Sequence, residues 1–479
     1  MGLQCAKLIW FRYNDKDQIP AHDEAKQAIF DQGTEVGELA RQLYPGGMVV
    51  APGIIDPDEV IAQTQMAIQK CQPLYEAAFL FNGGYARTDI LVPVSGGAWD
   101  LVEVKSTTSL KEEVHLPDIA FQAYVLAGAG IKLRKCFLAH INSNFVRHGK
   151  IDPQKFFTFE DVTQQVSVLS RNVEEQLGAM QHVIGKKAHP EIQIGPQCDA
   201  PYTCPLHDLC WAFLPEASVF TLYRGGQKGF ILLKQCIQHL ERIPAHFTLT
   251  ANQAIQRSAL IAGKPHIDRP AIGAFLKQIE YPASFLDFET IGTAIPLFDG
   301  ASPYQQIPFQ YSLHILRSEN AKPVHHQFLA EGTADPRPEL MRQLRDVLPE
   351  TGSVVAYNAG FETGRLEECC ELLPEFKPWV KKMTPRIVDL LLPFRGFRYY
   401  HPQQNGSASM KVVLPALTGK GYKNLAIQEG GAASREFLRV TFGNVAEKKR
   451  QRVRKDLEKY CGQDTMGMVD IVKVLKSLV

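Results

Sequence analysis

The sequence predicts an α/β protein of at least two domains, and two observations support this fold class. The chain has 479 residues, which is more than one ordinary domain holds. The first half has an amphipathic helical stretch followed by strand-like segments, and a buried strand at Ser284 begins a second part in which strands and helices alternate. We therefore expect one α/β domain at residues 1–215, a helical connector at 216–280 and a second α/β domain at 281–479.

The expected elements follow from local patterns along the chain. An amphipathic helix is predicted at residues 25–43, and three strands are predicted at 75–81, 87–93 and 99–105. The Gly-Gly pairs after Asn82 and after Ser95 are typical of the turns that join antiparallel strands. In the connector, helices are predicted at 232–240, 251–261 and 269–278, and the second domain begins with the strand 284–289.

Composition narrows the classes of function. Lys and Arg number 52 and Asp and Glu 51, so the formal net charge is +1 and any nucleic-acid site must be local. No apolar run reaches the roughly 18 residues that a membrane helix needs, and residues 1–12 contain no signal-peptide core. We therefore expect a cytosolic protein without a membrane span.

The chain has ten cysteines, which is a surplus for a protein expected in the cytosol. Three of them, Cys198, Cys204 and Cys210, share one Pro- and Asp-rich loop, and Cys5 lies far away in sequence. Four such thiolates can hold a cluster or a zinc ion, although structural zinc sites usually have shorter gaps. His207 in the same loop offers a Cys₃His zinc site without Cys5. The other six are expected to be small core side chains, namely Cys71, Cys136, Cys236, Cys369, Cys370 and Cys461.

A carboxylate–lysine pattern marks the first half of the chain. Residues i and i+2 of a strand face the same side, so Glu103 and Lys105 project together, and Asp89 on the paired strand can reach them. Two carboxylates that hold Mg²⁺, with a lysine beside the attacking water, suit phosphodiester hydrolysis. The alternative is a solvated strand face with an incidental Glu–Lys pair.

A second acidic set marks the C-terminal half. Asp287 and Glu289 share one face of an otherwise apolar strand, and burying them costs several kcal/mol unless a cation binds between them. Glu362 follows a strand–loop–helix segment, while Tyr460 and Asp464 are four residues apart and so share a helix face. A capped strand end is the structural alternative.

The first pattern, Asp89 with Glu103-x-Lys105 and then Phe121-Gln-Ala-Tyr124, resembles the RecB type of PD-(D/E)XK nucleases. That resemblance implies a restriction-endonuclease-like core in which Asp89 and Glu103 bind metal and Lys105 is catalytic. It also implies that Gln122 contacts the centre and that Glu76 is the acid of the preceding strand.

The cysteine layout adds to this resemblance. A subset of RecB-like nucleases carries one cysteine near the N-terminus and three after the core, all bound to a [4Fe–4S] cluster. Cys5, Cys198, Cys204 and Cys210 fit this layout, although the relatives often have C-x₂-C where this chain has C-x₅-C. Such relatives also use an early helical histidine as a metal ligand, and residues 33–41 offer only Glu35 and Glu38.

The C-terminal pattern resembles the DEDD 3′→5′ exonucleases, whose RNase H-like domain is a mixed sheet flanked by helices. Asp287 and Glu289 match the first motif, Tyr-Asn-x-x-Phe-Glu362 the second, and Tyr460-x₃-Asp464 the third. The resemblance implies two Mg²⁺ or Mn²⁺ ions and a tyrosine that positions water. The second motif normally ends in Asp, so Glu362 is a departure. Asp389 either assists or caps a strand.

The chain as a whole, with residues 303–309 and 409–417, resembles uncharacterised bacterial proteins that join these two parts. A basic run before the third motif is expected to steer nucleic acid toward Asp464, or else to be a solvated helix face. The residues of this run expected to contact nucleic acid are Lys448, Lys449, Arg450, Arg452 and Arg454. Residues 395–400 either stack bases or belong to the core, and His325 and His326 are expected at the surface.

These patterns together predict a metal-dependent nuclease with two active centres. Both resemblances imply processing of ends, so single-stranded or frayed DNA is the expected substrate, with RNA as an alternative. The competing class is a nucleic-acid-binding scaffold in which one or both centres no longer cut, and Glu362 leaves this open for the second centre.

Overall fold

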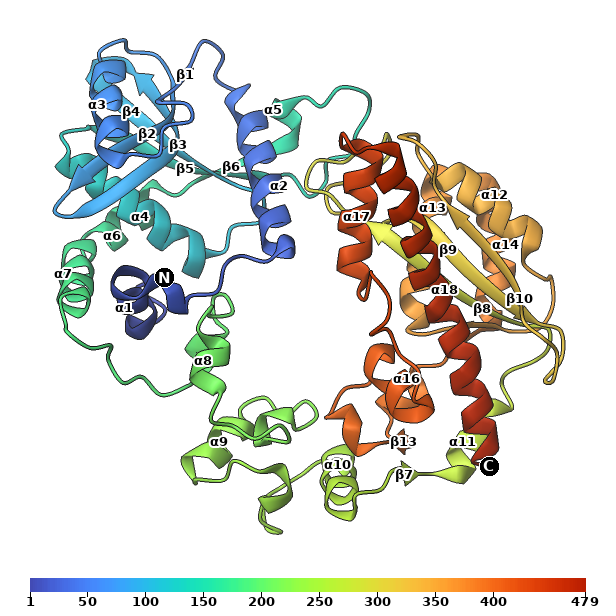
Figure 1. Ribbon diagram of the computed structural model, residues 1–479. Helices are drawn as coiled ribbons and strands as arrows, with labels where there is room; N and C mark the ends of the chain where they lie inside the picture. Colours follow the sequence, from blue (N-terminus) through green and yellow to red (C-terminus); the bar gives the residue numbers. More distant parts are fainter. The chain divides into compact units, whose positions relative to one another are not determined.

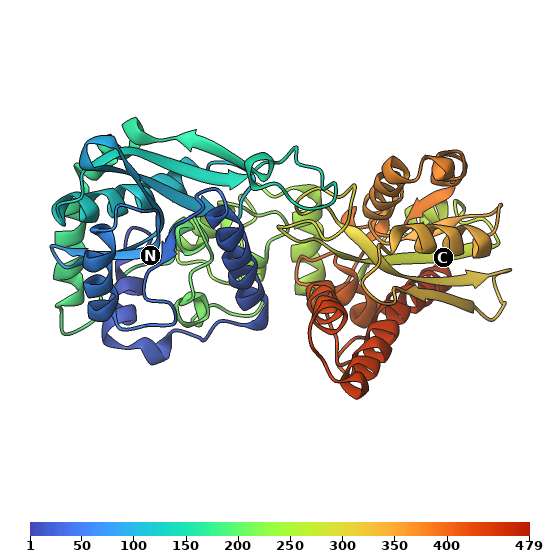
Figure 2. The same cartoon turned by 90° about the horizontal axis from the view of Figure 1, so that it is seen from above.

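The computed structural model describes residues 1–479 and is a mixed α/β structure with two main sheets, each flanked by helices (Figure 1, Figure 2). The chain forms two compact units. One contains residues 1–212 and 292–305, and the other contains residues 213–291 and 306–479. None of the helices combines the length and the apolar character that crossing a membrane requires.

The first unit is built on a six-stranded sheet in which the strands follow one another in sequence order. Strands β2 to β4 form the antiparallel meander predicted by the Gly-Gly turns, and β5 runs parallel to β4. The strands are β1 (Met48–Val49), β2 (Leu74–Phe81), β3 (Gly84–Val94), β4 (Ala98–Lys105), β5 (Leu133–Ile141) and β6 (Phe157–Asp161). The three strands expected from the sequence are therefore confirmed.

Helices of the first unit cover both faces of this sheet. The predicted N-terminal helix is α2 (Glu24–Arg41), and Asp23 caps it by accepting a hydrogen bond from Lys26 N at 2.7 Å. Helix α4 (Glu112–Gly128) connects β4 to β5 and buries Ile119 and Leu126 against the sheet. The others are α1 (Ala6–Asn14), α3 (Pro57–Ile68), α5 (Pro153–Phe156), α6 (Thr163–Ser170), α7 (Val173–Ile184) and α8 (His207–Trp211).

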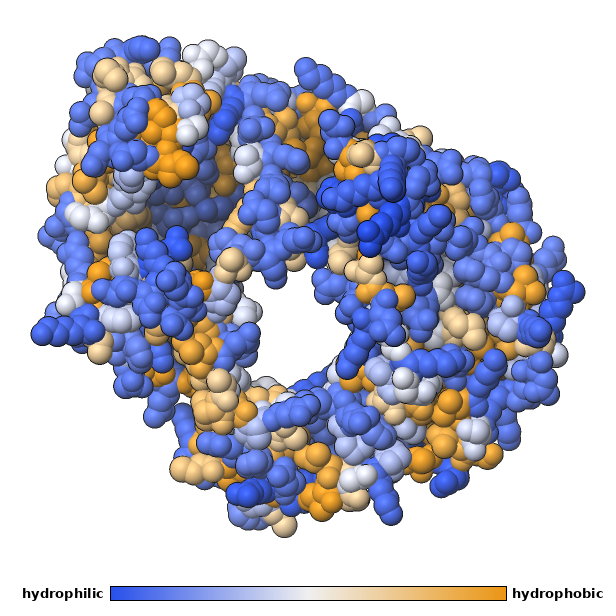
Figure 3. Space-filling view, viewed as in Figure 1, coloured by the Kyte–Doolittle hydropathy of each residue, from blue (hydrophilic) through white to orange (hydrophobic).

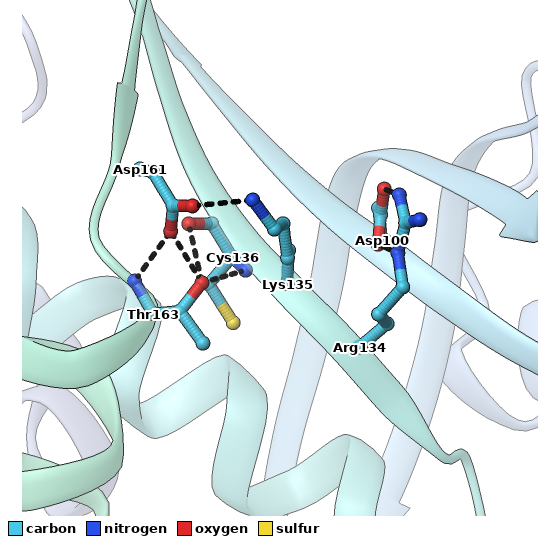
Figure 4. A network of polar contacts seen from close by, with 6 residues as sticks. All are labelled: Asp100, Arg134, Lys135, Cys136, Asp161 and Thr163. Atoms are coloured by element: carbon cyan, nitrogen blue, oxygen red, sulfur yellow. Dashed lines mark hydrogen bonds and ion pairs between the residues drawn. The ribbon is translucent and has the colours of Figure 1, made fainter.

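Polar contacts fix the register of β5 against its neighbours (Figure 4). Arg134 is an extra residue in β5 at an irregularity beside Asp100, and its Nε donates to Asp100 Oδ1 at 2.9 Å. On the other side, Lys135 Nζ lies 2.8 Å from Asp161 Oδ2, and Thr163 Oγ1 donates to Asp161 Oδ1. These hydrogen bonds lower the pKa of Asp161 to about 2. The network thereby anchors the strand that pairs with the carboxylate-bearing β4.

The segment 292–305, which follows strand β8 (Ala283–Ile291), packs within the first unit. Its Ala294 N donates to Gln32 Oε1 at 2.9 Å, and Arg147 Nη1 donates to Pro296 O at 2.7 Å. Tyr304 OH donates to the carbonyl of Ser106, which is the residue after β4. This segment therefore lies beside the end of the strand that carries Lys105.

The second unit is built on a five-stranded sheet in the order β10-β9-β8-β11-β12. The central β8 is the buried strand expected from the sequence; it is antiparallel to β9 and parallel to β11. The other strands are β9 (Ile307–Leu316), β10 (Val324–Leu329), β11 (Val354–Ala356) and β12 (Ile387–Asp389). Two further short strands, β7 (His266–Ile267) and β13 (Tyr399–Tyr400), pair with each other.

Helices lie on both faces of the second sheet. Helices α17 (Gly430–Phe442) and α18 (Glu447–Ser477) cover one face, and the opposite face carries α12 (Arg337–Val347), α13 (Ala359–Leu372) and α14 (Lys377–Met383) (Figure 1, Figure 2). Two shorter helices, α15 (Leu392–Arg395) and α16 (Met410–Thr418), lie between β12 and α17 in the sequence. Strand β8 is thus positioned so that its polar residues meet residues from both helical layers.

The predicted connector helices are confirmed at α10 (Ala251–Ala262) and α11 (Arg269–Leu276), but the one at 232–240 is wrong. Helix α9 covers only Lys228–Lys234, because Cys236 adopts a left-handed backbone with φ of 61°. Cys236 and Cys71 are also exposed, which corrects their expected core role. The core expectation holds for the four buried cysteines Cys136, Cys369, Cys370 and Cys461.

Candidate functional site

A cleft of about 720 Å³ in the second unit brings together the acids of all three C-terminal motifs. Asp287 and Glu289 enter it from β8, Glu362 from the first turn of α13, and Asp464 from α18. Tyr460 lines the same cleft one helical turn before Asp464. Residues far apart in the sequence therefore meet at one place, as the motif order predicted.

The loop between β11 and α13 is held by Asp389 at the end of β12. Asp389 Oδ1 accepts hydrogen bonds from Asn358 N and Leu391 N, both at 3.0 Å. These bonds support Asn358, whose φ of 80° turns the chain sharply into α13. Asp389 therefore caps this loop, and, in addition to burial, its charge helps to raise the pKa of Glu362.

The carboxylates of the cleft have too few positively charged neighbours to neutralise them. Glu289, Glu362 and Asp464 are only 2–6% exposed, and Glu362 Oε2 accepts no hydrogen bond. Burial raises the pKa of Glu289 and Glu362 to about 8 and that of Asp464 to about 7. Burial, followed by Asp464, Glu289 and Glu362, also raises the pKa of Asp287.

This donor set fits divalent cations. Buried anionic oxygens that lack a counter-charge are the ligands that Mg²⁺ and Mn²⁺ prefer. Ligand oxygens of Asp287 and Glu289 lie within 4.8 Å of each other, so a single ion can contact both carboxylates, and the Cys461 sulfur lies within the same distance. Lys411 is the nearby cation, and its charge lowers the pKa of Glu289 and Asp464 only in part.

Three residues of the cleft region were not predicted as functional. Tyr422 OH donates to Asp464 Oδ1 at 2.5 Å and fixes that carboxylate. Lys411 Nζ lies 5.9 Å from the centre of the Tyr460 ring and lines the cleft. Cys461 is fully buried, with Sγ 3.7 Å from Asp287 Oδ2. Of these, only Cys461 has a sequence signal, because it directly follows Tyr460 of the third motif.

The raised pKa values predict how stability depends on pH. In the unfolded chain these carboxyls ionise near pH 4, whereas in the folded cleft they retain protons up to about pH 7–8. The folded state then binds more protons, so its free energy of unfolding falls as the pH rises between those limits. We expect the unfolding temperature in EDTA to fall from pH 5 to pH 8.

The same melting series in Mg²⁺ should show a smaller decrease, because a bound cation favours the ionised carboxylates. Asp287→Asn in EDTA should also flatten the slope, since it removes one of the repelling charges. An unfolding temperature in EDTA that rises steadily over this pH range would contradict the electrostatics assigned to the cleft.

A second polar centre lies in the first unit on β3, β4 and α4. Glu103 is 5% exposed; its Oε1 accepts from Lys105 Nζ at 2.7 Å and its Oε2 accepts from Gln122 Nε2 at 2.8 Å. Asp89 Oδ2 accepts from Val104 N at 2.7 Å. Burial and then Glu103 raise the pKa of Asp89. The structure thus brings Asp89, Glu103, Lys105 and Gln122 together.

The lysine of this centre has two anionic partners. Burial lowers the pKa of Lys105, but Glu103 and Asp118 outweigh that effect and raise it. Asp118 Oδ2 lies 2.8 Å from Lys105 Nζ and was not predicted from the sequence. Lys105 therefore remains charged and bridges β4 to α4.

Glu76 occupies a strained position beside this centre. Its φ is 62° in the middle of β2, a backbone conformation that is uncommon for residues other than glycine. Its carboxylate forms ion pairs with Arg41 at 2.9 Å and Arg87 at 3.1 Å, yet it is close enough to raise the pKa of Asp89. The helical acids Glu35 and Glu38 are exposed on α2.

The four cysteines of the split layout line one pocket in the first unit, together with His207. Gln4 Nε2 donates to Gln197 O at 2.8 Å, which joins the segment before Cys5 to the loop that carries the other three. Burial raises the pKa of Cys204, and the neighbouring Cys5, Cys198 and Cys210 raise it further. No three of the four sulfur atoms lie within 4.8 Å of one another.

The basic run at the start of α18 divides into two groups. Arg450 Nε donates to Val440 O at 2.9 Å and Arg454 Nη1 donates to Ala330 O at 2.7 Å, so both arginines anchor the helix. Lys448, Lys449 and Arg452 are exposed. Figure 3 shows hydrophilic residues gathered over this first half of α18. Arg450 and Arg454 are thus partly engaged in contacts within the second unit, and their contact with nucleic acid stays a prediction.

The remaining aromatic and histidine motifs also have clear positions. Phe397, Tyr399 and Tyr400 are buried, and Phe397 stacks on Tyr400 with ring centres 4.4 Å apart, so the aromatic residues of 395–400 belong to the core. Arg395, by contrast, is exposed and lines the cleft. His325 is exposed, as expected, although its Nε2 lies 2.9 Å from Ser312 Oγ.

The fold and the cleft define a mixed α/β protein with an acidic site, and comparison with known proteins finds partial similarities. Residues 284–409 match the model of the Domain of unknown function (DUF2779). This segment contains Asp287, Glu289 and Glu362, whereas Asp464 lies outside it.

Curated relatives are similar to part of this chain. It is 27% identical over 213 residues to the uncharacterized protein MG366 of Mycoplasma genitalium, covering 41% of this chain and 32% of that protein. It is 23% identical over 235 residues to the uncharacterized protein UU173 of Ureaplasma parvum, covering 44% and 34%. The chain thus spans about a third of the length of these relatives.

A solved structure described as the crystal structure of SSO0001 is also similar. The match has 13% sequence identity and a TM-score of 0.17, and it covers 44% of this chain and 97% of that one.

Proposed function

We propose that this protein is a metal-dependent nuclease whose C-terminal cleft trims nucleic acid strands from the 3′ end. The observation that carries the proposal is the convergence of four carboxylates, three buried and one half-buried, from β8, α13 and α18 around one cleft. A structural role would leave these charges paired, whereas Glu362 Oε2 has no partner. The sheet order, with β9 antiparallel beside the central β8, supports an RNase H-like domain.

The residues of the cleft have distinct expected roles in this reaction. Divalent cations held by the carboxylates would supply an activated water and neutralise charge on the leaving oxygen. Tyr460 stays protonated, because burial and then Asp464 raise the pKa of its hydroxyl, so it can orient the attacking water. Tyr422 holds Asp464 in place. Lys411 contributes positive charge toward the substrate phosphate.

The first unit is proposed to hold a second nuclease centre of the PD-(D/E)XK type. Asp89 and Glu103 offer carboxylate oxygens for a metal ion, and Gln122 fixes Glu103 by hydrogen bonding. Lys105 is charged and lies beside Glu103, where it can orient water or stabilise developing negative charge. Glu76 stays a proposed ligand, and its release from Arg41 and Arg87 is then required.

The cysteine pocket is proposed to hold a [4Fe–4S] cluster. What supports this proposal is the split layout itself, because Cys5 and the three loop cysteines line one pocket. Such a cluster would tie Cys5 to the distant loop and stabilise the first unit.

Cys204→Ser is expected to remove this cluster. Cys204 is the buried member of the set, so its loss takes away a ligand that solvent cannot replace. Protein purified without oxygen should lose its brown colour and its iron, and the unfolding temperature of the first unit should fall. Cys236→Ser, at an exposed cysteine outside the pocket, serves as the control. Colourless wild-type protein with one zinc per chain would refute the cluster.

The substrate is proposed to be a single-stranded or frayed DNA end, with RNA as the alternative. Lys448, Lys449 and Arg452 are exposed on the helix that carries Asp464, where they can attract phosphates. The test uses 5′-labelled DNA and RNA strands of equal sequence, with Mg²⁺ or Mn²⁺. Progressive shortening from the 3′ end supports the proposal, and a strand with a blocked 3′ end should resist. Binding without cleavage of either strand would favour a scaffold.

A further inference from the structure

We propose that Asp287, Glu289 and Cys461 form a binding site for thiophilic cations of the Zn²⁺ and Cd²⁺ class, and that such an ion blocks the C-terminal cleft. The ligand atoms of these three residues lie within 4.8 Å of one another. This inference rests on the proposed function, since it concerns which cation occupies the same carboxylates.

The thiol of Cys461 is placed as a ligand rather than as packing. Its sulfur lies 3.7 Å from Asp287 Oδ2 and 3.9 Å from the carbonyl oxygen of Asp287, on a side chain with no exposed surface. A buried thiol that serves only to fill space is normally surrounded by apolar groups. Here it faces a carboxylate that already repels its acidic neighbours.

Glu362 gives an independent sign that the cleft suits a cation. It is 2% exposed, it lines the same cleft, and its Oε2 accepts no hydrogen bond. A buried carboxylate oxygen without a donor is costly, and a bound cation removes that cost. The site therefore has an acidic pair and an adjacent sulfur, and the cleft around it holds an unsatisfied carboxylate oxygen.

Ligand chemistry makes this set selective. Mg²⁺ is a hard ion that takes oxygen ligands in octahedral geometry and gains little from sulfur. Zn²⁺ and Cd²⁺ bind thiolate strongly, so Cys461 adds affinity for these ions alone. On binding, the S–H bond breaks, a metal–sulfur bond forms and the thiol proton leaves to solvent. Binding should therefore tighten as the pH rises.

The inference has a direct test that does not depend on activity. Full-length protein with intact Cys5, Cys198, Cys204 and Cys210 is titrated with Cd²⁺, and the ultraviolet cadmium–thiolate band is recorded. Wild type should show one cadmium-bound thiolate more than Cys461→Ser. Cys461→Ala should show the same loss, which guards against an effect of serine on folding. Cys370→Ser is the control, because Cys370 is a buried thiol on α13 outside the cleft. It should keep the cadmium signal of the cleft, and Glu289→Gln serves as the comparison that alters the cleft itself.

Inhibition is the second readout. Zn²⁺ added to Mg²⁺-loaded enzyme should inhibit trimming by wild type at a concentration at least about tenfold lower than it inhibits Cys461→Ser. Superimposable Cd²⁺ titrations of wild type and Cys461→Ser would overturn the inference even if both proteins trim normally. If neither wild type nor Cys461→Ser trims DNA, but their Cd²⁺ titrations differ, the result would count against the proposed function and not against this cation site.

Discussion

Asp464→Asn is expected to reduce Mg²⁺-dependent 3′ trimming by at least about a hundredfold. Asp464 is 5% exposed and its Oδ1 is fixed by the Tyr422 hydroxyl, so an amide here keeps the shape but loses the charge. The same substitution should raise the unfolding temperature in EDTA at pH 8, because it removes one repelling carboxylate from the buried set. A loss of activity together with a gain in stability is what we expect when a substituted carboxylate binds a catalytic cation.

Asp456→Asn is the matched control for this prediction. Asp456 is on the same helix two turns earlier and outside the cleft, where it forms only a 3.7 Å ion pair with Lys459. It should leave both trimming and the unfolding temperature in EDTA close to wild type. If Asp464→Asn trims at the wild-type rate, 3′ trimming must be reassigned to the centre in the first unit.

Lys105→Ala is expected to reduce cleavage by the first unit at least about a hundredfold when activity is measured in an Asp287→Ala background. Lys105 is the cation beside Glu103 and also pairs with Asp118, so alanine removes the charge that would orient water. The fold should persist, since the core beneath β4 is apolar and the lysine is partly exposed.

Lys135→Ala provides the comparison for Lys105. Lys135 is on the neighbouring β5 of the same sheet and pairs with a single carboxylate, Asp161, at 2.8 Å (Figure 4). Circular dichroism should show that both variants fold, and only Lys105→Ala should lose cleavage of tailed DNA. Equal residual cleavage in the two variants would remove Lys105 from the proposed mechanism.

The sequence was informative wherever periodicity decides the outcome. The alternation in β8 places Asp287 and Glu289 on one face, and the i,i+4 spacing of α18 places Tyr460 with Asp464, as the structure has them. The Gly-Gly turns likewise set the meander that carries Asp89, Glu103 and Lys105.

Sequence periodicity does not predict contacts that distant loops and long side chains make. Tyr422 reaches Asp464 from a loop 42 residues away, and no spacing rule connects them. Arg454 reads as part of a solvated basic run, yet it binds a carbonyl 124 residues away. Similarly, nothing local marks Cys236 as left-handed, so the helix predicted around it was too long. Tertiary packing decides each of these cases.

The most direct test of the central claim is release of the terminal nucleotide from a single strand labelled at its 3′ end. Wild-type protein in Mg²⁺ should release the labelled mononucleotide before any shorter internal product forms, whereas EDTA or Asp287→Asn should leave the strand intact. Equal release by Asp287→Asn, or internal fragments as the first products, would contradict a metal-dependent 3′ exonuclease in the acidic cleft.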